Sequence, residues 1–298
     1  MTLPTLSLSV LVPVYNEEKT VGPVVRKVLT LGELLKEVVI IDDGSTDGTA
    51  GVVEALAKQT RLVRFVPLKR NQGKTAAIRH ALAQATGEVI VIQDADLEYD
   101  PAEIPALVEP ILNGQADVVY GSRFMVRKAA RVLYFYHYLA NRLLTFTCNL
   151  LTNRNMTDIE TGYKAFRAGV IKPLQLTSSG FGMEVEITAL ISKTKARTYE
   201  VPISYYGRGY DEGKKIGFKD GIMAGIYILY YNLIKPWLPA GRRYVREVNR
   251  FLRECEQVPA DSMPFGGPLT SFAPPSSLAT TDCSQQGARH FHPRSPTR

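Results

Sequence analysis

The sequence predicts an α/β fold, with a mostly parallel sheet and helices on both of its faces. Runs of aliphatic, mainly β-branched residues, which are typical of buried strands, end near Val14, Ile41, Val66, Ile92 and Tyr120. Helical segments fill the gaps, and this alternation favours parallel pairing of the strands. Polar loops follow several strands, and the carboxyl ends of parallel strands lie at one edge of a sheet. We therefore expect a ligand site at that edge.

The expected helices cover about residues 19–29, 48–58, 75–85 and 101–113. The last of these begins at Pro101 after Asp100, a residue type that caps helices. A longer helical segment is expected at about 130–152, and a further strand at 199–206. The basic, glycine-rich segment 207–217 predicts a mobile loop.

Composition narrows the kinds of partner. The 298 residues are 45% hydrophobic, which is ordinary for a globular protein, and the formal net charge is +7. This charge favours an anionic partner such as a nucleotide diphosphate, a lipid phosphate or a membrane surface. No recognition motif accompanies the charge, so nucleic acid is not an expected partner. The scattered Cys148, Cys255 and Cys283 predict neither a disulfide framework nor a zinc site, and fit a reducing compartment.

Neither a secretory signal nor a membrane span is expected. The apolar segment 6–14 has no basic residues before it and fits a first strand better than a signal peptide. The segment 221–234 is apolar, but it is too short to cross a bilayer.

Two acids directly follow the strand that ends at Ile92. Asp94 and Asp96 carry hard oxygen ligands, suited to a Mg²⁺ or Mn²⁺ ion that also holds a substrate diphosphate. A solvated turn is the alternative, because two acids at this spacing are common. Glu98 follows two residues later, either as a further support for the cation or as an exposed acid before a turn.

The segment Gly73-Lys74-Thr75 differs from a Walker phosphate-binding loop. That loop requires a glycine at the position of Leu68. The segment is instead a loop that enters a helix, where backbone donors can meet an anion. The glycine pattern of dinucleotide-binding oxidoreductases is also absent from the sequence.

Short motifs lie along the chain in the order Pro13–Glu17, Asp42–Asp47, Asn71–Lys74, Asp94–Asp96, Gly121–Phe124, Thr157–Lys164 and Tyr199–Ile203. Together they resemble the motifs of family 2 glycosyltransferases. The resemblance covers about residues 6–235, and it narrows to the branch that contains the dolichyl-phosphate mannose and glucose synthases. It implies a GT-A fold, a nucleotide-sugar donor, a polyprenyl phosphate acceptor and a divalent metal.

The resemblance also implies roles for individual residues. The base of the nucleotide would lie among Pro13, Tyr15 and Glu17, Asp43 would face the base or ribose, and Asp42 would cap its loop. The nucleotide site as a whole is expected to comprise Pro13, Tyr15, Glu17, Asp43, Lys74, Asp94 and Ala95, the metal site Asp94, Asp96 and Glu98, and the catalytic group Asp94, Asp96, Asp158 and Arg208.

Basic residues in the second half of the chain are expected to hold the acceptor. Arg123, Arg131, His137 and Lys214 are the candidates, and His137 is near a place where the best-described synthases carry a serine. The loop with Arg208 would close over the phosphates. The expected helix at 130–152 combines basic residues with an apolar, aromatic surface, as is typical of a helix at a membrane interface. Core packing with arginines that extend to solvent explains that pattern equally well.

We expect a GT-A domain over residues 1–235, with acceptor-side helices from about residue 130. A C-terminal helical extension follows at 236–257. The segment 258–298 is rich in Pro, Ser, Thr and Gly and is expected to be disordered.

The leading hypothesis is a metal-dependent inverting glycosyltransferase that moves a hexose from a donor of the GDP-mannose or UDP-glucose type to polyprenyl or dolichyl phosphate. It would work in the cytoplasm, on the cytoplasmic face of a membrane, or through a membrane-anchoring partner. A phosphate acceptor is already ionised at neutral pH, whereas a hydroxyl acceptor needs a base. Asp158 is the candidate for that base, or it holds the segment 161–163. Transfer to a saccharide or lipid hydroxyl, and an inactive nucleotide-sugar-binding adaptor, are the alternatives. The acids Asp43, Asp94 and Asp96 argue against the adaptor.

Overall fold

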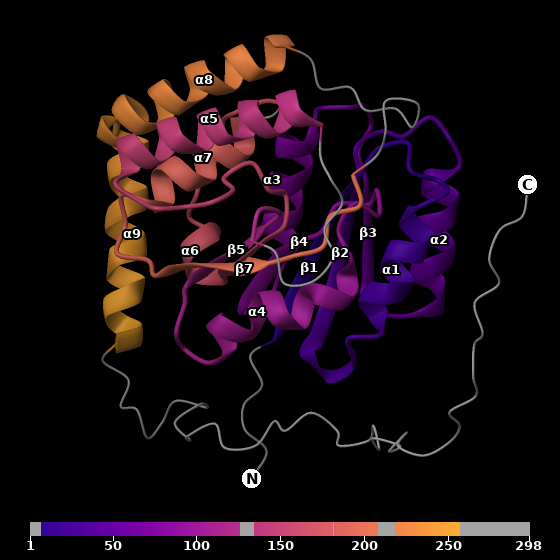
Figure 1. Cartoon of the computed structure of the whole chain (residues 1–298). Coiled ribbons are helices and arrows are strands. Elements are labelled where there is room, and N and C mark those ends of the chain that lie inside the picture. Colours follow the sequence, from indigo (N-terminus) through magenta and orange to yellow (C-terminus); the bar gives the residue numbers. More distant parts are fainter. Residues whose placement is uncertain (1–6, 126–133, 181, 208–217, 257–298) are drawn as a thin grey trace, which may run out of the picture. The chain divides into compact units, whose positions relative to one another are not determined.

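The protein, as a computed structural model, is described over residues 7–125, 134–180, 182–207 and 218–256 (Figure 1). In these ranges one sheet of seven strands has the order β3-β2-β1-β4-β6-β5-β7. All neighbouring strands pair in parallel except β6, which is antiparallel to both β4 and β5. The expected mostly parallel α/β fold is therefore confirmed. The strands are β1 Leu8–Val14, β2 Leu35–Asp42, β3 Val63–Pro67, β4 Val89–Ile92, β5 Val118–Ser122, β6 Lys164–Arg167 and β7 Thr198–Pro202.

Helices cover both faces of this sheet. Successive residues of a strand point to opposite faces, so Val10 and Val12 of β1 pack in one buried cluster and Leu11 in the other. Because neither face meets water, these strands are apolar along almost their whole length.

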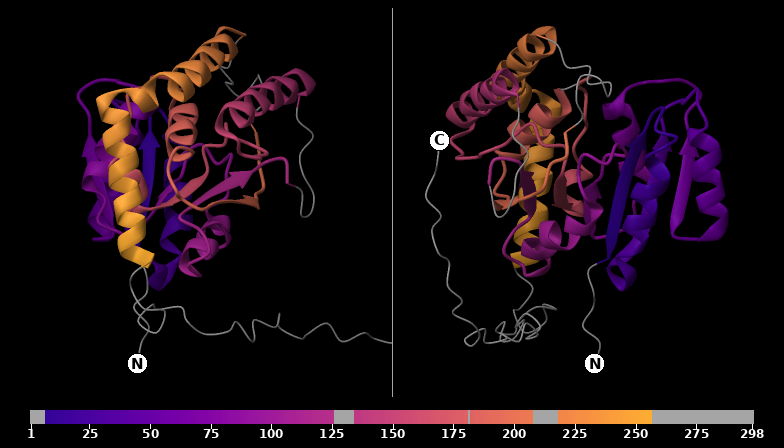
Figure 2. Two further views of the ribbon diagram at one scale, coloured as in Figure 1. Left: turned by 90° about the vertical axis from the view of Figure 1, so that its left-hand side faces the viewer. Right: turned by 45° about the vertical axis from the view of Figure 1, so that its right-hand side comes forward.

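The first face is covered by α1 Val21–Leu29, α2 Thr49–Gln59 and α4 Ile104–Leu112. The second face is covered by a larger set of helices, among which α8 packs against both α5 and α7 (Figures 1 and 2). This set consists of α3 Lys74–Gln84, α5 Phe135–Thr152, α6 Ala168–Ile171, α7 Gly182–Ile191, α8 Phe218–Leu233 and α9 Pro239–Glu256. Short 3₁₀ turns lie at Gly32–Leu34, Pro101–Glu103 and Lys235–Trp237.

The sequence located the first five strands and the first four helices. It did not predict β6, a strand of four residues in the middle of the sheet, and it extended β7 to Tyr206 although the strand ends at Pro202. Helix α9 lies within the expected C-terminal extension, and its buried Tyr244, Val248 and Leu252 join the second-face cluster. None of the helices in the described ranges has both the length and the apolar character required to cross a bilayer. The division into domains stays a prediction, and the tail 258–298 lies outside the described residues.

Candidate active site

The site is built at the edge where β2, β1 and β4 end side by side. Ile41 pairs with Pro13, and Ile92 pairs with Leu11, so the loops that follow these strands start next to one another. Because β6 runs the opposite way, its first residue, Lys164, lies beside Ile92. The segment that precedes β6 therefore enters the site at the very edge where the parallel strands leave the sheet.

The loops that follow β2 and precede α3 are tied together by Asp42 and Asp43. Asp42 accepts a hydrogen bond from the Ser45 backbone N–H at 2.9 Å, which agrees with its expected capping role. Asp43 is 3% exposed, and its two oxygens accept from the backbone N–H groups of Gln72 and Gly73 at 2.8 and 2.7 Å. Asp43 thus holds the loop before α3, and its contact with a nucleotide stays a prediction.

The expected base-binding residues lie at the end of β1. Pro13 is within the strand, and the Tyr15 side chain is 43% exposed at the edge. Glu17 Oε2 accepts a hydrogen bond from Thr20 Oγ1 at 2.5 Å. An exposed ring beside a fixed loop suits stacking of a base. The role of all three residues in nucleotide binding stays a prediction.

The loop with Asp94 and Asp96 contains an unusual backbone conformation. Leu97 has φ 65°, in the left-handed region that branched and bulky residues avoid at a cost of about 1–2 kcal/mol. Asp96 Oδ1 accepts from the Glu98 backbone N–H at 3.0 Å, which closes the turn around Leu97. Below it, the Gln93 amide donates to the backbone carbonyl of Asp94 at 3.0 Å. Strain of this kind persists where surrounding contacts enforce it, and such places cluster at functional sites.

Glu98 has a protein partner of its own. Its Oε2 accepts a hydrogen bond from the Tyr205 hydroxyl at 2.9 Å. No group of three His, Cys, Asp or Glu side chains in the described parts of the chain is placed to hold a metal ion. Ligation of a cation by Asp94, Asp96 and Glu98 therefore stays a prediction.

Lys74, the first residue of α3, faces two acids. Its Nζ is 2.8 Å from Asp94 Oδ1 and 3.0 Å from Oδ2, and 3.5 Å from Glu184 Oε1 on α7. Burial alone would lower the pKa of Lys74, but the charge of Asp94, and then of Glu184, raises it above its ordinary value. The ammonium therefore stays charged at neutral pH. Ala95, between the two acids of the loop, is buried.

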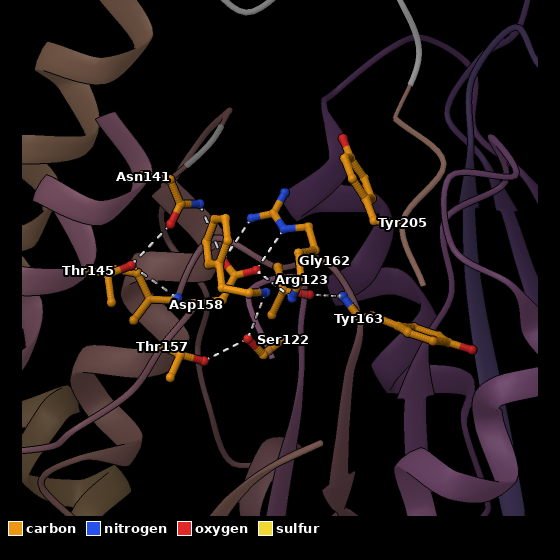
Figure 3. A network of polar contacts seen from close by, with 12 residues as sticks. Ser122, Arg123, Asn141, Thr145, Thr157, Asp158, Gly162, Tyr163 and Tyr205 are labelled. Carbon is orange, nitrogen blue, oxygen red and sulfur yellow. Dashed lines mark hydrogen bonds and ion pairs between the residues drawn. The ribbon is translucent and has the colours of Figure 1, made fainter. Parts of the chain in front are cut away.

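An ion pair joins Arg123, which follows β5, to Asp158 (Figure 3). Arg123 Nε is 2.7 Å from Asp158 Oδ2, and Nη2 is 2.8 Å from Oδ1. The Asn141 amide on α5 donates to Oδ1 at 3.3 Å. Asp158 is fully buried, which opposes its ionisation, but the Arg123 guanidinium outweighs burial and holds the pKa of the carboxyl below its ordinary value. All its acceptor positions face donors, so the geometry suits a residue that positions Arg123 better than a base.

Aromatic rings join the acid loop, which carries Asp94 and Asp96, to the Arg123–Asp158 ion pair. The Arg123 guanidinium lies 5.2 Å from the centroid of the Tyr205 ring, and the Tyr205 hydroxyl reaches Glu98. Tyr99 stacks on Tyr163 at 5.2 Å between ring centroids, and its hydroxyl accepts from the Gly162 backbone N–H at 3.2 Å. Together, these contacts of Tyr205 and Tyr99 hold the acid loop at a fixed distance from Arg123 and from the segment that precedes β6.

A second lysine lies buried behind these residues. Lys164 is 1% exposed, and its ammonium donates to the backbone carbonyls of Ile159 and Thr161. Burial lowers its pKa to about 8. Nearby, burial and then the charge of Glu184 raise the pKa of Glu160 to about 8, and the Glu160 Oε1 atom is buried with no hydrogen-bond partner among the described residues.

The structure brings the sequence-predicted residues together only in part. Asp94, Asp96, Lys74, Arg123 and Asp158 lie around the edge just described. His137 is on α5, with its ring 6.0 Å from the Tyr134 ring, and its acceptor role stays a prediction. The predicted acceptor and loop residues Arg131, Arg208 and Lys214 lie outside the described residues.

Several residues of the site could not be assigned a role from the sequence, among them Glu184, Asn141 and Gly162. Glu184 and Asn141 come from helices without any recognisable motif. Gly162 was part of a motif, but only the fold reveals that a β-carbon there would stand 2.5 Å from Asp94 Oδ2.

The chain is similar in sequence to a family model and to several known proteins. The family model described as "Glycosyl transferase family 2" matches residues 9–174. The chain is 31% identical over 176 residues to a dodecaprenyl-phosphate galacturonate synthase of Rhizobium johnstonii, covering 58% of this chain and 51% of that protein. It is 29% identical over 215 residues to a dolichol-phosphate mannosyltransferase of Pyrococcus furiosus, covering 71% and 60%. The chain thus spans only about half to two thirds of the length of these relatives.

A solved structure shares the fold. Glucosyl-3-phosphoglycerate synthase from Mycobacterium tuberculosis, in complex with Mn²⁺, UDP-glucose and phosphoglyceric acid, superposes with a TM-score of 0.59 at 22% identity. The match covers 76% of this chain and 79% of that chain. At this level of identity the similarity supports a shared fold, but it does not indicate which ligands this chain binds.

Proposed function

Because the chain belongs to glycosyl transferase family 2, we propose that it transfers a hexose from a nucleotide sugar to polyprenyl phosphate with inversion at the anomeric carbon. The observation that carries this proposal is the acid loop at the carboxyl edge of the sheet, with Arg123 held on its acceptor side. The names of the relatives add support. The galacturonate synthase and the mannosyltransferase differ in sugar, yet each name contains a polyprenyl phosphate.

The acid loop suits a divalent cation. Asp94 and Asp96 offer hard carboxylate oxygens, and the Lys74 ammonium lies against both oxygens of Asp94, as a stand-in for a cation. Mg²⁺ or Mn²⁺ held there would stabilise the charge of the departing diphosphate. Asp43 accepts hydrogen bonds from the Gln72 and Gly73 backbone N–H groups and so fixes the loop before α3, which would bring the N-terminal end of that helix, beginning at Lys74, to the phosphates.

A phosphate acceptor fits the chemistry available on the other side. A phosphate monoester, with a second pKa of about 6, is ionised at neutral pH and needs no base. Its oxygen forms the new bond to the anomeric carbon while the bond from that carbon to the diphosphate breaks, and the nucleoside diphosphate leaves. Arg123, held by Asp158, is placed to pair with the acceptor phosphate as a charge-assisted donor. The expected base role of Asp158 finds no support in its buried ion pair.

An exposed apolar face supports work at a membrane surface. Large side chains of α5, among them Phe135, Phe146 and Leu150, are at least 66% exposed. On the neighbouring α8, Ile226 and Leu229 are at least 50% exposed, and Trp237, which follows, is 69% exposed. Residues 134–156 and 221–238 contain no Asp or Glu, as suits an anionic bilayer surface. We place the protein peripherally on the cytoplasmic face, alone or beside a membrane partner.

A donor and acceptor screen tests the proposal. Purified protein is incubated with UDP- and GDP-sugars, in the presence of Mn²⁺ or chelator, and with polyprenyl phosphate, polyprenol or a soluble saccharide. We expect transfer only to the phosphate and only with a divalent cation. Asp96→Asn should abolish transfer and Asp94→Asn should weaken donor binding, because a neutral amide is a poor ligand beside a diphosphate. Transfer to a hydroxyl alone, or full activity of both variants in chelator, would show the proposal to be wrong.

A further inference from the structure

One lysine is shared by two acids that come from different parts of the fold. Lys74 at the start of α3 contacts Asp94 after β4 through both carboxylate oxygens, at 2.8 and 3.0 Å. Glu184, in the first turn of α7, lies 3.5 Å from the same Nζ. The side chains are 32%, 19% and 8% exposed for Lys74, Asp94 and Glu184, so the ammonium lies between an outer acid and a deeper one.

The backbone leaves this group little room. A β-carbon at Gly162 would be 2.5 Å from Asp94 Oδ2 and 3.2 Å from Lys74 Nζ, so the peptide at Gly162 packs directly against the pair. The Gly162 N–H is itself held by the Tyr99 hydroxyl. Asp94 therefore cannot turn toward that side, and the ammonium that covers it has to move if another cation is to reach the same oxygens.

Charge determines where the ammonium can go. A divalent cation on Asp94 repels an adjacent ammonium, and the repulsion is strong away from bulk water. A charged group displaced into a partly buried place without a partner is costly. Glu184 removes this difficulty, because it already lies within a short side-chain movement of Lys74 Nζ.

We infer that Lys74 and a divalent cation are alternative occupants of Asp94, and that Glu184 is the positioning residue that receives the ammonium when the cation binds. This inference rests on the proposed function, because it takes Asp94 as a cation ligand. Its consequence is that Glu184 governs cation affinity through Lys74 and not as a ligand of the cation.

A double-mutant cycle with Mn²⁺ binding as the readout tests the inference. Free Mn²⁺ is titrated by electron paramagnetic resonance into the full chain and into Lys74→Met, Glu184→Gln and the double variant, without donor. Lys74→Met should bind Mn²⁺ about tenfold tighter, within the usual range of coupling between sites. Glu184→Gln should bind it several-fold weaker. In the Lys74→Met background, Glu184→Gln should have no further effect.

The last comparison is the decisive one. If Glu184 acted only as a nearby negative charge, Glu184→Gln would weaken Mn²⁺ binding equally in both backgrounds, and that result would overturn the inference. Unchanged or weaker binding by Lys74→Met would also overturn it. If Glu184→Gln does not fold, Glu184→Asp can be compared in the same two backgrounds, because the shorter side chain of Asp places its carboxylate farther from the Lys74 ammonium.

A further variant separates this inference from the proposed function. Asp94→Asn should abolish Mn²⁺ binding in the wild-type background. Suppose that Asp94→Asn abolishes Mn²⁺ binding, but Glu184→Gln weakens it equally with Lys74 and with Met at position 74. Then Asp94 is a cation ligand, and only the movement of the Lys74 ammonium from Asp94 to Glu184 is wrong. If Mn²⁺ binding survives Asp94→Asn, the metal site is wrong as well, and the inference falls with it.

Discussion

Gly162 lies against Asp94 so closely that any side chain at position 162 would collide with the carboxylate. An added β-carbon would be 2.5 Å from Asp94 Oδ2, well inside van der Waals contact. The atom it meets is the end of a side chain, so the conflict is relieved by moving Asp94 rather than by unfolding. The position of Asp94 therefore depends on Gly162, more than sixty residues later in the sequence. Gly162 lies just before β6, the antiparallel strand that the sequence did not predict.

Gly162→Ala should therefore harm function far more than stability. We expect a loss of less than about 1 kcal/mol in the free energy of unfolding, typical of a tolerated substitution. Transfer and Mn²⁺ affinity should each fall at least about tenfold, since displacement of a reacting group by 1 Å is costly. Gly51→Ala is the matched control, because nothing lies within 4 Å of a β-carbon there and the residue is exposed on α2. Normal transfer by Gly162→Ala would contradict this placement of Asp94.

Asp158→Asn should lower stability as well as activity. The substitution leaves the Arg123 guanidinium, 14% exposed, without its buried counter-charge, at a cost of about 3 kcal/mol. Since the pKa of Asp158 is lowered in the folded protein, its contribution to stability is present above the ordinary carboxyl pKa and is lost as the pH falls through the lowered value. Urea denaturation at pH 7 and pH 3 measures both effects. A variant of normal stability that has lost transfer would instead support a base at Asp158 and a hydroxyl acceptor.

How much of this site was visible in the sequence depends on how local each signal is. Asp94 and Asp96 follow a run of β-branched residues, and such runs identify strand ends directly. The segment Lys164–Arg167 carries no such run: it is short, and its lysine is buried through contacts to backbone carbonyls rather than by apolar character. For the same reason the sequence could not show that Gly162 faces Asp94 or that Glu184 faces Lys74. Both contacts join residues that are far apart in the sequence, and they depend on the order of the strands in the sheet, which cannot be read from any one segment.

Stability should fall as the pH rises from about 5 to 8, and Glu160 should account for part of that fall. Its pKa is raised to about 8 in the folded protein from an ordinary value near 4.5, so across this window the folded protein keeps a proton that the unfolded chain loses. The free energy of unfolding should then decline by at most about 1.4 kcal/mol per pH unit. Glu160→Gln should flatten the dependence of melting temperature on pH, whereas Glu54→Gln on the exposed side of α2 should not. An unchanged slope in Glu160→Gln would contradict the raised pKa.

The exposed face of α5 and α8 should determine binding to lipid. Phe146→Glu and Leu229→Glu place charges at positions that are 66% and 50% exposed, so neither should unfold the protein. Each should reduce binding to vesicles containing anionic lipid, measured by sedimentation, and binding by the unaltered protein should weaken at high salt. Leu62→Glu is the control, because Leu62 is also an exposed apolar residue but lies between α2 and β3. Equal vesicle binding by all the variants would show that this face does not meet lipid.

Removal of the chain after Glu256 should leave the fold intact. Helix α9 ends at Glu256, and its buried Tyr244, Val248 and Leu252 all lie before that point. The sequence beyond it offers little apolar periodicity with which to build a core. We expect the melting temperature and nucleotide binding of the truncated chain to match those of the full chain. A marked fall in melting temperature would show that the tail packs on the domain.

The central place of β6 also bears on how the chain folds. Parallel strands β1, β2 and β3 join through short helical connections, whereas Ile92 of β4 meets Lys164 of β6 only after the whole intervening chain has closed into a loop. Closure of a long loop costs entropy before its contacts form, and contacts between distant residues slow folding. We therefore expect β1, β2 and β3 to assemble while Asp94 still lacks Gly162 as its neighbour. The ability to bind a ligand at this edge should then be acquired late in folding, and substitutions that weaken the pairing of β6 should delay it even when the finished protein is stable.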